Sequence, residues 1–143
     1  TNMFKAAVSG APGVNMTSAY GGIRWESGKS RMFQYEQTQS RIGGTLWDKP
    51  AEFIRNSPLF FLPQVQTPVL IMHNDKDGSV MWEQGIEFFM ALRRLDKPVW
   101  LFNYKGEGHH LKKWENRLDY SRRVMEFYDY YLKDGKKPEW MKS

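Results

Sequence analysis

The chain contains three short runs of apolar residues whose pattern is typical of strands buried on both faces. The clearest is "VLIM" at 69–72, which follows Pro68 and has no polar residue on either face. A second run, "KPVWLFNY", covers 97–104, and a third, "FKAAVSGAPG", covers 4–13 and ends in turn-forming residues. Parallel strands that are covered on both sides lose the alternation of apolar and polar residues seen in half-exposed strands. The pattern therefore predicts three strands of a buried parallel sheet.

Segments with the period of an α-helix follow the strands predicted at 69–72 and at 97–104. Residues 80–95 are apolar except for one narrow polar stripe, which predicts a helix lying against a sheet. Residues 114–133 carry aromatic and aliphatic side chains at helical spacing, and Gly135 follows as a helix stop. Shorter helices are expected at 30–42 and at 50–54, the second beginning with a proline that suits a first helical position.

The alternation of strands and helices predicts an α/β fold, with parallel strands and flanking helices. At 143 residues, with 41% hydrophobic and 15% aromatic content, the chain can fill the core of one compact domain. Right-handed crossovers bring the loops that follow parallel strands to one edge of the sheet. Polar residues in those loops are therefore the first candidates for a functional site.

Two acids and a histidine stand in those positions. Asp75 and Asp77 follow the strand that ends near Met72, and His109 follows the strand that ends near Tyr104. A carboxylate that meets an imidazole can fix its tautomer and stabilise the imidazolium formed when the ring accepts a proton from a nucleophile. The order acid and then histidine, with room for one helix and one strand between them, is the order of an α/β-hydrolase. On chemistry alone, either acid could serve.

Three segments of the chain carry a family resemblance: "TPVLIMHNDKDGSV", "FFMALRRLDKPVWLFNYKGEGHHL" and "FYDYYLKDGKKPEWM". They closely resemble the C-terminal catalytic domain of prolyl-oligopeptidase-family serine peptidases, the group that includes dipeptidyl peptidase IV and acylaminoacyl peptidases. Residues 2–28 are similar to the part of those proteins that follows the nucleophile elbow. The resemblance implies a C-terminal portion of an α/β-hydrolase fold, a peptide substrate and no cofactor.

The resemblance also assigns roles to individual residues. The triad acid falls on Asp77, three residues before a valine in "DGSV", and the triad base falls on His109 in "GEGHHL". Asp75 is then expected to be a structural turn residue. Ser79 stands where relatives place a substrate-facing side chain, and Tyr20 and Trp25 are the candidates for the pocket of the residue that precedes the cleaved bond.

The nucleophile is missing from this pattern. No Gly-x-Ser-x-Gly occurs in the 143 residues, and Ser9 in "VSGAP" lacks the flanking glycines of an elbow. The family's elbow would lie just upstream of Thr1, so we expect residues 1–143 to be a single partial α/β-hydrolase catalytic domain that lacks the nucleophile-elbow strand. We expect this part alone to be inactive. Its open sheet edge should bind the upstream part of the same enzyme or cause self-association.

A metal site is the main alternative reading of the polar loops. Histidine and carboxylate side chains are common ligands of zinc and iron. The candidate ligands would be His73, Asp75, Asp77, His109 and His110. No His-x-x-x-His or cysteine pair accompanies them, and adjacent histidines seldom bind one ion, so hydrolase chemistry is favoured, with His73 and His110 as structural residues.

The composition of the chain narrows the remaining classes of function. The net charge of +5 is scattered along the chain, which favours a solvated surface over a nucleic-acid footprint. The chain has no cysteine and no apolar run of membrane-spanning length, and these features do not assign a cellular location. Within the hydrolases an esterase or lipase stays open as an alternative to a peptidase, and a non-catalytic interaction module that retains the fold is the alternative from another class.

Overall fold

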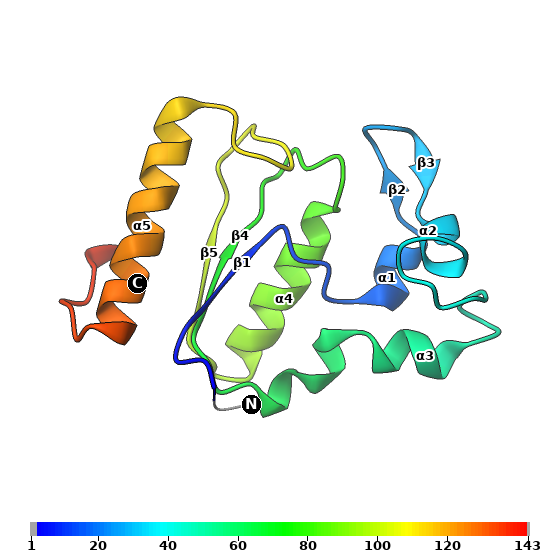
Figure 1. Cartoon of the computed structure of the whole chain (residues 1–143), viewed down its shortest axis with the longest axis horizontal. Helices are drawn as coiled ribbons and strands as arrows, with labels where there is room; N and C mark the ends of the chain where they lie inside the picture. Colours follow the sequence, from blue (N-terminus) through cyan, green and yellow to red (C-terminus); the bar gives the residue numbers. More distant parts are fainter. Residues whose placement is uncertain (1–2, 143) are drawn as a thin grey trace.

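The computed structural model describes residues 3–142. Its main sheet has three parallel strands (Figure 1). Strand β4 (Val69–Met72) lies in the middle, between β1 (Ala7–Gly10) and β5 (Val99–Phe102). All four residues of β4 are buried, as its unbroken apolar sequence predicts. In the register, Met72 is level with Gly10 and with Phe102, so all three strands end at the same edge of the sheet. The predicted α/β fold is confirmed.

The two long helices cover opposite faces of this sheet, as Figure 1 shows. Helix α4 (Trp82–Arg94) packs over Val69 and Ile71, and helix α5 (Trp114–Leu132) packs over Leu70. Successive residues of a strand point to opposite faces, so one short apolar strand contributes to both hydrophobic cores. Both helices were predicted, although α4 begins at Trp82 and not at Val80, because residues 78–80 continue the turn that follows β4.

A second group of short elements lies beyond α4, on the side away from α5 (Figure 1). Its core is formed by Ala19, Tyr20, Tyr35 and Phe53. The elements that join β1 to β4 are α1 (Met16–Tyr20), β2 (Ile23–Arg24), β3 (Lys29–Ser30), α2 (Met32–Glu36), α3 (Pro50–Arg55) and the 3₁₀ helix η1 (Pro58–Gln64). A further 3₁₀ helix, η2 (Glu139–Met141), follows α5.

The sequence pattern was least reliable in this second group. Helix α3 begins at Pro50 as predicted, but the helix expected at 30–42 covers only Met32–Glu36. Arg41 then has a positive φ of 52°, which a helix does not contain, and the turn brings the Ile42 amide to the Tyr35 carbonyl. The antiparallel pair β2–β3, α1 and η1 were not predicted, because each is too short to show a period.

None of the helices within residues 3–142 combines the length and the apolar composition that crossing a bilayer requires.

Candidate active site

Asp77 lies in the turn that connects β4 to α4, and its carboxylate is held from several directions. Its Oδ1 accepts hydrogen bonds from the backbone amides of Ser79 and Val80, both at 2.8 Å. Only 6% of the residue is exposed. An aspartate that caps the amides two and three residues ahead forms a tight local turn, which is why "DGSV" folds in this way. The turn amides therefore hold Oδ1 of the carboxylate by local contacts alone.

His109 reaches this carboxylate from the loop that follows β5. Its Nδ1 lies 2.9 Å from Oδ2 and 3.1 Å from Oδ1 of Asp77. Because β4 and β5 are parallel and end in register, residues 32 positions apart meet at one edge of the sheet. The carboxylate accepts the Nδ1 proton, which leaves Nε2 as the basic nitrogen; Nε2 has no hydrogen-bond partner among residues 3–142. This is the arrangement of a general base held by an acid.

The groups that donate hydrogen bonds to Asp77 keep its carboxylate charged. Burial by itself would raise the pKa of this carboxyl, but hydrogen bonds from His73, from His109 and from the amides of Val80 and Ser79 outweigh burial and hold the pKa well below its usual range. Asp77 is thus an ionised carboxylate at neutral pH. That is the state needed to stabilise a protonated His109.

The acid loop and the histidine loop are tied together by buried polar groups. The side chain of Asn74, 1% exposed, accepts a hydrogen bond from the Tyr104 amide at 3.0 Å and donates one to the Gly108 carbonyl at 2.9 Å. Asp75 accepts a hydrogen bond from the Gly106 amide at 2.8 Å. Asp75 is therefore a connector between the two loops and makes no hydrogen bond to His109.

Glu107 gives the histidine loop its shape from within. Its carboxylate accepts hydrogen bonds from the amides of Lys112 and Lys113, both at 2.9 Å, and from the side chain of Asn116 at 2.8 Å. These donors at the start of α5 lower the pKa of Glu107 to about 2. A carboxylate at a helix N-terminus satisfies amides that have no partner inside the helix. The same contacts hold the segment that carries His109.

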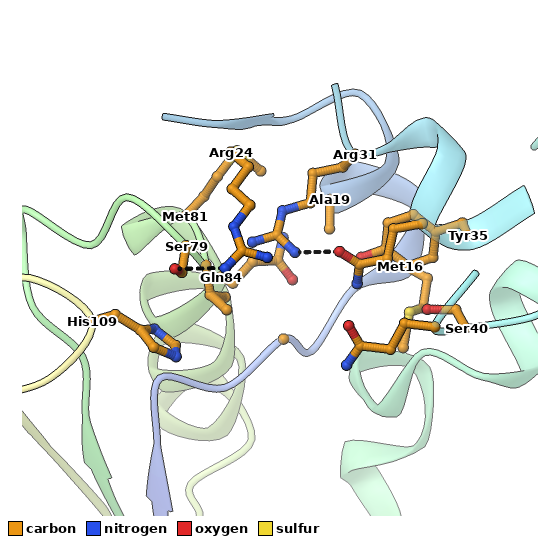
Figure 2. A pocket seen from close by; sticks show the side chains of 14 residues that line it. Met16, Ala19, Arg24, Arg31, Tyr35, Ser40, Ser79, Met81, Gln84 and His109 are labelled. Carbon is orange, nitrogen blue, oxygen red and sulfur yellow. Dashed lines mark hydrogen bonds between the residues drawn. The ribbon is translucent and has the colours of Figure 1, made fainter. Parts of the chain in front are cut away.

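A cavity of about 410 Å³ opens beside His109 (Figure 2). Ser79 forms part of its wall, and the Ser79 hydroxyl donates to Glu26 Oε2 at 2.7 Å and accepts from Arg24 Nη2 at 3.3 Å. A role of Ser79 in substrate binding stays a prediction. Arg24 and Arg31 also line the cavity, and sequence reasoning missed both. Their spacing carries no signal, because basic residues are scattered along the chain and only the fold brings these two together.

The other two predicted pocket residues lie outside this wall. Tyr20 is 2% exposed in the aromatic core of the second group, and its hydroxyl donates to Glu36 Oε1 at 2.5 Å. Trp25 is 70% exposed in the turn between β2 and β3. Neither side chain lines the cavity beside His109. Their assignment to the pocket for the residue that precedes the cleaved bond stays a prediction.

The histidines and acids of these loops are arranged as hydrogen-bond partners. Among residues 3–142, no group of three or more His, Asp or Glu side chains has the geometry to hold a metal ion. Asp77 lies 3.2 Å from His73 Nε2 and 2.9 Å from His109 Nδ1, and both nitrogens contact its carboxylate. His110 packs edge-on against the His109 ring, with centroids 4.7 Å apart.

Comparison with curated proteins finds relatives that match parts of the chain. The chain is 38% identical to human acylamino-acid-releasing enzyme over 69 residues, which are 48% of this chain and 9% of that protein. It is 30% identical to an uncharacterized peptidase of Bacillus subtilis over 117 residues, covering 79% of this chain and 16% of the other. The chain thus spans less than a fifth of the length of these relatives.

Solved structures show the same fold. Acylaminoacyl peptidase from Pyrococcus horikoshii superposes with a TM-score of 0.79 at 20% identity, covering 100% of this chain and 22% of that one. The family model of the prolyl oligopeptidase family matches residues 1–135. Together with the α/β fold, this match shows that the chain belongs to the prolyl oligopeptidase family of serine peptidases.

Proposed function

We propose that residues 1–143 supply the acid and the base of a serine peptidase active site, with Asp77 and His109 in these roles. The observation that carries the proposal is the hydrogen bond from His109 Nδ1 to the buried Asp77 carboxylate, with Nε2 left without a partner among the described residues. Membership of a family of serine peptidases supports it. The substrate class is a peptide, and no cofactor takes part in the chemistry.

The mechanism follows from the roles of these groups. A serine hydroxyl attacks the carbonyl carbon of the peptide while His109 Nε2 accepts the hydroxyl proton. His109 then gives this proton to the leaving amine, the C–N bond breaks and an acyl-enzyme remains. Water attacks the acyl carbon, His109 accepts the proton from water and returns it to the serine oxygen as the acid product leaves. Asp77 orients the ring and stabilises its charged form.

We further propose that the attacking serine lies outside residues 1–143. The sequence has no Gly-x-Ser-x-Gly, and no serine hydroxyl within the described residues hydrogen-bonds to His109. Ser9 lies in β1, level with Ile71 of β4, and is not at a strand-to-helix turn. Among residues 3–142, strand β1 is at the edge of the sheet and has no strand on its outer side, where the strand leading to the nucleophile would pair.

This free edge leads to an expectation for residues 1–143 expressed alone. They should be inactive and should self-associate, because Phe4 next to β1 is 59% exposed and the strand edge is unpaired among the described residues. Analytical ultracentrifugation measures the association. A monomer at all concentrations would contradict the expectation.

The proposed function is tested in a protein that also contains the segment preceding Thr1. A fluorophosphonate probe should label a serine in that segment, and the kcat for peptide cleavage should fall by roughly 10³ to 10⁴ in Asp77→Asn and at least as much in His109→Ala. Asp75→Asn is the matched control, because its carboxylate contacts the Gly106 amide and not His109. Failure of the probe to label any serine, or a larger loss in Asp75→Asn than in Asp77→Asn, would overturn the assignment and favour a non-catalytic module or the other acid.

A further inference from the structure

The cavity beside His109 has a positively charged wall. Its charged and titratable side chains include Arg24, Arg31 and His109, and no Asp or Glu lines it within residues 3–142. In Figure 2 both guanidinium groups point into the same space, Arg24 from the β2–β3 pair and Arg31 from the start of α2. A concave site lined by cations without acids attracts an anion.

Arg31 is a buried cation with an incomplete set of partners. The residue is 8% exposed, and its Nη1 donates to Gln34 Oε1 at 2.7 Å. Its Nη2 is buried and has no hydrogen-bond acceptor among the described residues, and no carboxylate within them forms an ion pair with this side chain. A buried charge that lacks a counterion is costly, so the unpaired donor of Arg31 calls for a partner, such as a bound anion or water.

Arg24 brings a second positive charge to the wall of the cavity. Burial is the main cause that lowers the pKa of the Arg31 guanidinium below its ordinary value, and the positive charge of Arg24 acts in the same direction, against smaller opposing effects of Tyr35 and Asp77. Arg24 itself is held loosely: its side chain is 46% exposed, and its Nη2 lies 3.3 Å from Ser79 Oγ and 3.9 Å from Glu26 Oε2. This loosely held side chain can shift to admit an anion, and the anion would then contact both guanidinium groups.

We propose that this cavity binds a carboxylate of the peptide substrate, next to the bond on which His109 acts. The inference rests on the proposed peptidase function and names the substrate class within it. Arg31 supplies a fixed planar donor group that suits a carboxylate, and Arg24 supplies the second cation. At about 410 Å³ the cavity has room for one side chain or chain end of a peptide. The carboxylate can come from Asp or Glu beside the cleaved bond, or from the C-terminus of a short peptide.

Matched substrates test this proposal in a protein that contains the nucleophile. Peptides with Asp or Glu beside the cleaved bond are compared with their Asn and Gln isosteres, with both ends blocked, and a separate pair compares free and amidated C-termini. A kcat/KM at least about tenfold higher for the acid member of either pair supports the proposal and identifies the source of the carboxylate. Equal values for both members of both pairs would overturn it.

Variants test whether the cavity causes the preference for acidic peptides. In Arg31→Gln the ratio of kcat/KM for the acid member to kcat/KM for its neutral isostere, both measured on that variant, should fall to about one. Arg55→Gln, an exposed position on α3 outside the cavity, is the matched control and should keep the preference. Thermal melting of each variant shows whether it is folded. A preference retained by folded Arg31→Gln would contradict the proposal.

A binding measurement separates this inference from the proposed function. Calorimetric titration with a blocked peptide carrying the preferred acid, and with its amide isostere, needs no turnover. Tighter binding of the acid peptide that is lost in Arg31→Gln supports the carboxylate site even if no peptide is cleaved, in which case only the peptidase function fails. Equal binding of both peptides by the wild-type protein would overturn the carboxylate site alone.

Discussion

His73 Nε2 lies 3.2 Å from Oδ2 of Asp77. The same nitrogen lies 3.0 Å from the carbonyl oxygen of Val80. Two acceptors around one ring nitrogen place the proton on Nε2, so His73 donates to the carboxylate that holds His109. Asp77 is therefore held by a buried histidine from its own strand end as well as by the turn amides, and under the proposed function we infer that His73 positions the acid.

Replacing His73 should weaken catalysis without affecting substrate binding. In a nucleophile-containing protein we expect His73→Leu to lower kcat by roughly tenfold, equivalent to about 1.4 kcal/mol, since Asp77 loses one donor. KM should stay within about twofold. His73→Gln, whose amide can donate to Asp77, should recover part of the loss. Equal kcat values for the two variants would assign His73 a role in packing only.

Gly85 provides the space that the His73 ring occupies. A Cβ at position 85 would lie 2.5 Å from Nδ1 and 2.7 Å from Cβ of His73, closer than real contacts allow. Alanine normally stabilises a helix interior by about 0.5–1 kcal/mol relative to glycine. For Gly85→Ala we expect a destabilisation instead, a loss of about 1–3 kcal/mol in the free energy of unfolding, because the His73 ring must move. Urea denaturation measures it, with Gly21→Ala, where a Cβ meets nothing within 4 Å, as the control.

Asn74 joins the two loops and should be sensitive to truncation. Removing its side chain leaves the Tyr104 amide and the Gly108 carbonyl without their present partners. We expect Asn74→Ala to cost about 1–3 kcal/mol of unfolding free energy. The exposed Asn56, whose side chain donates to the Glu52 carbonyl, is the matched control and should change stability by less than about 0.5 kcal/mol. Similar losses at both positions would show that the link between the loops adds nothing.

The stabilising effect of Glu107 should depend on pH. Its pKa is lowered from 4.5 to about 2 in the folded protein, so its contribution is complete above pH 4.5 and is lost as the pH falls toward 2. Glu107→Gln should therefore be less stable than the wild type at neutral pH, and the difference should shrink steadily between pH 4.5 and 2. Chemical denaturation across this range measures the trend. Glu115→Gln, an exposed change in the same helix start, should show no such convergence.

The sequence by itself determined the parallel sheet and the ends at which its polar residues gather. An unbroken apolar strand such as Val69–Met72 is stable only when it is buried on both faces. This requirement concerns consecutive residues, so it can be recognised in the sequence. The Asp77 turn is also local, because the aspartate caps amides two and three residues ahead. The approach of Asp77 and His109 could therefore be predicted from strand order alone, although the choice of Asp77 over Asp75 needed the family resemblance.

Only the tertiary structure decided which other side chains complete the site. His73 meets Asp77 because Gly85 of α4 leaves room for its ring, and Asn74 meets Gly108 because two strands end in register. Arg24 and Arg31 line one cavity with His109 because an unpredicted strand pair and the start of a short helix hold them there. These contacts join residues that are distant in sequence or lie in elements too short to show a period. Their partners are set by packing, which the linear pattern does not contain.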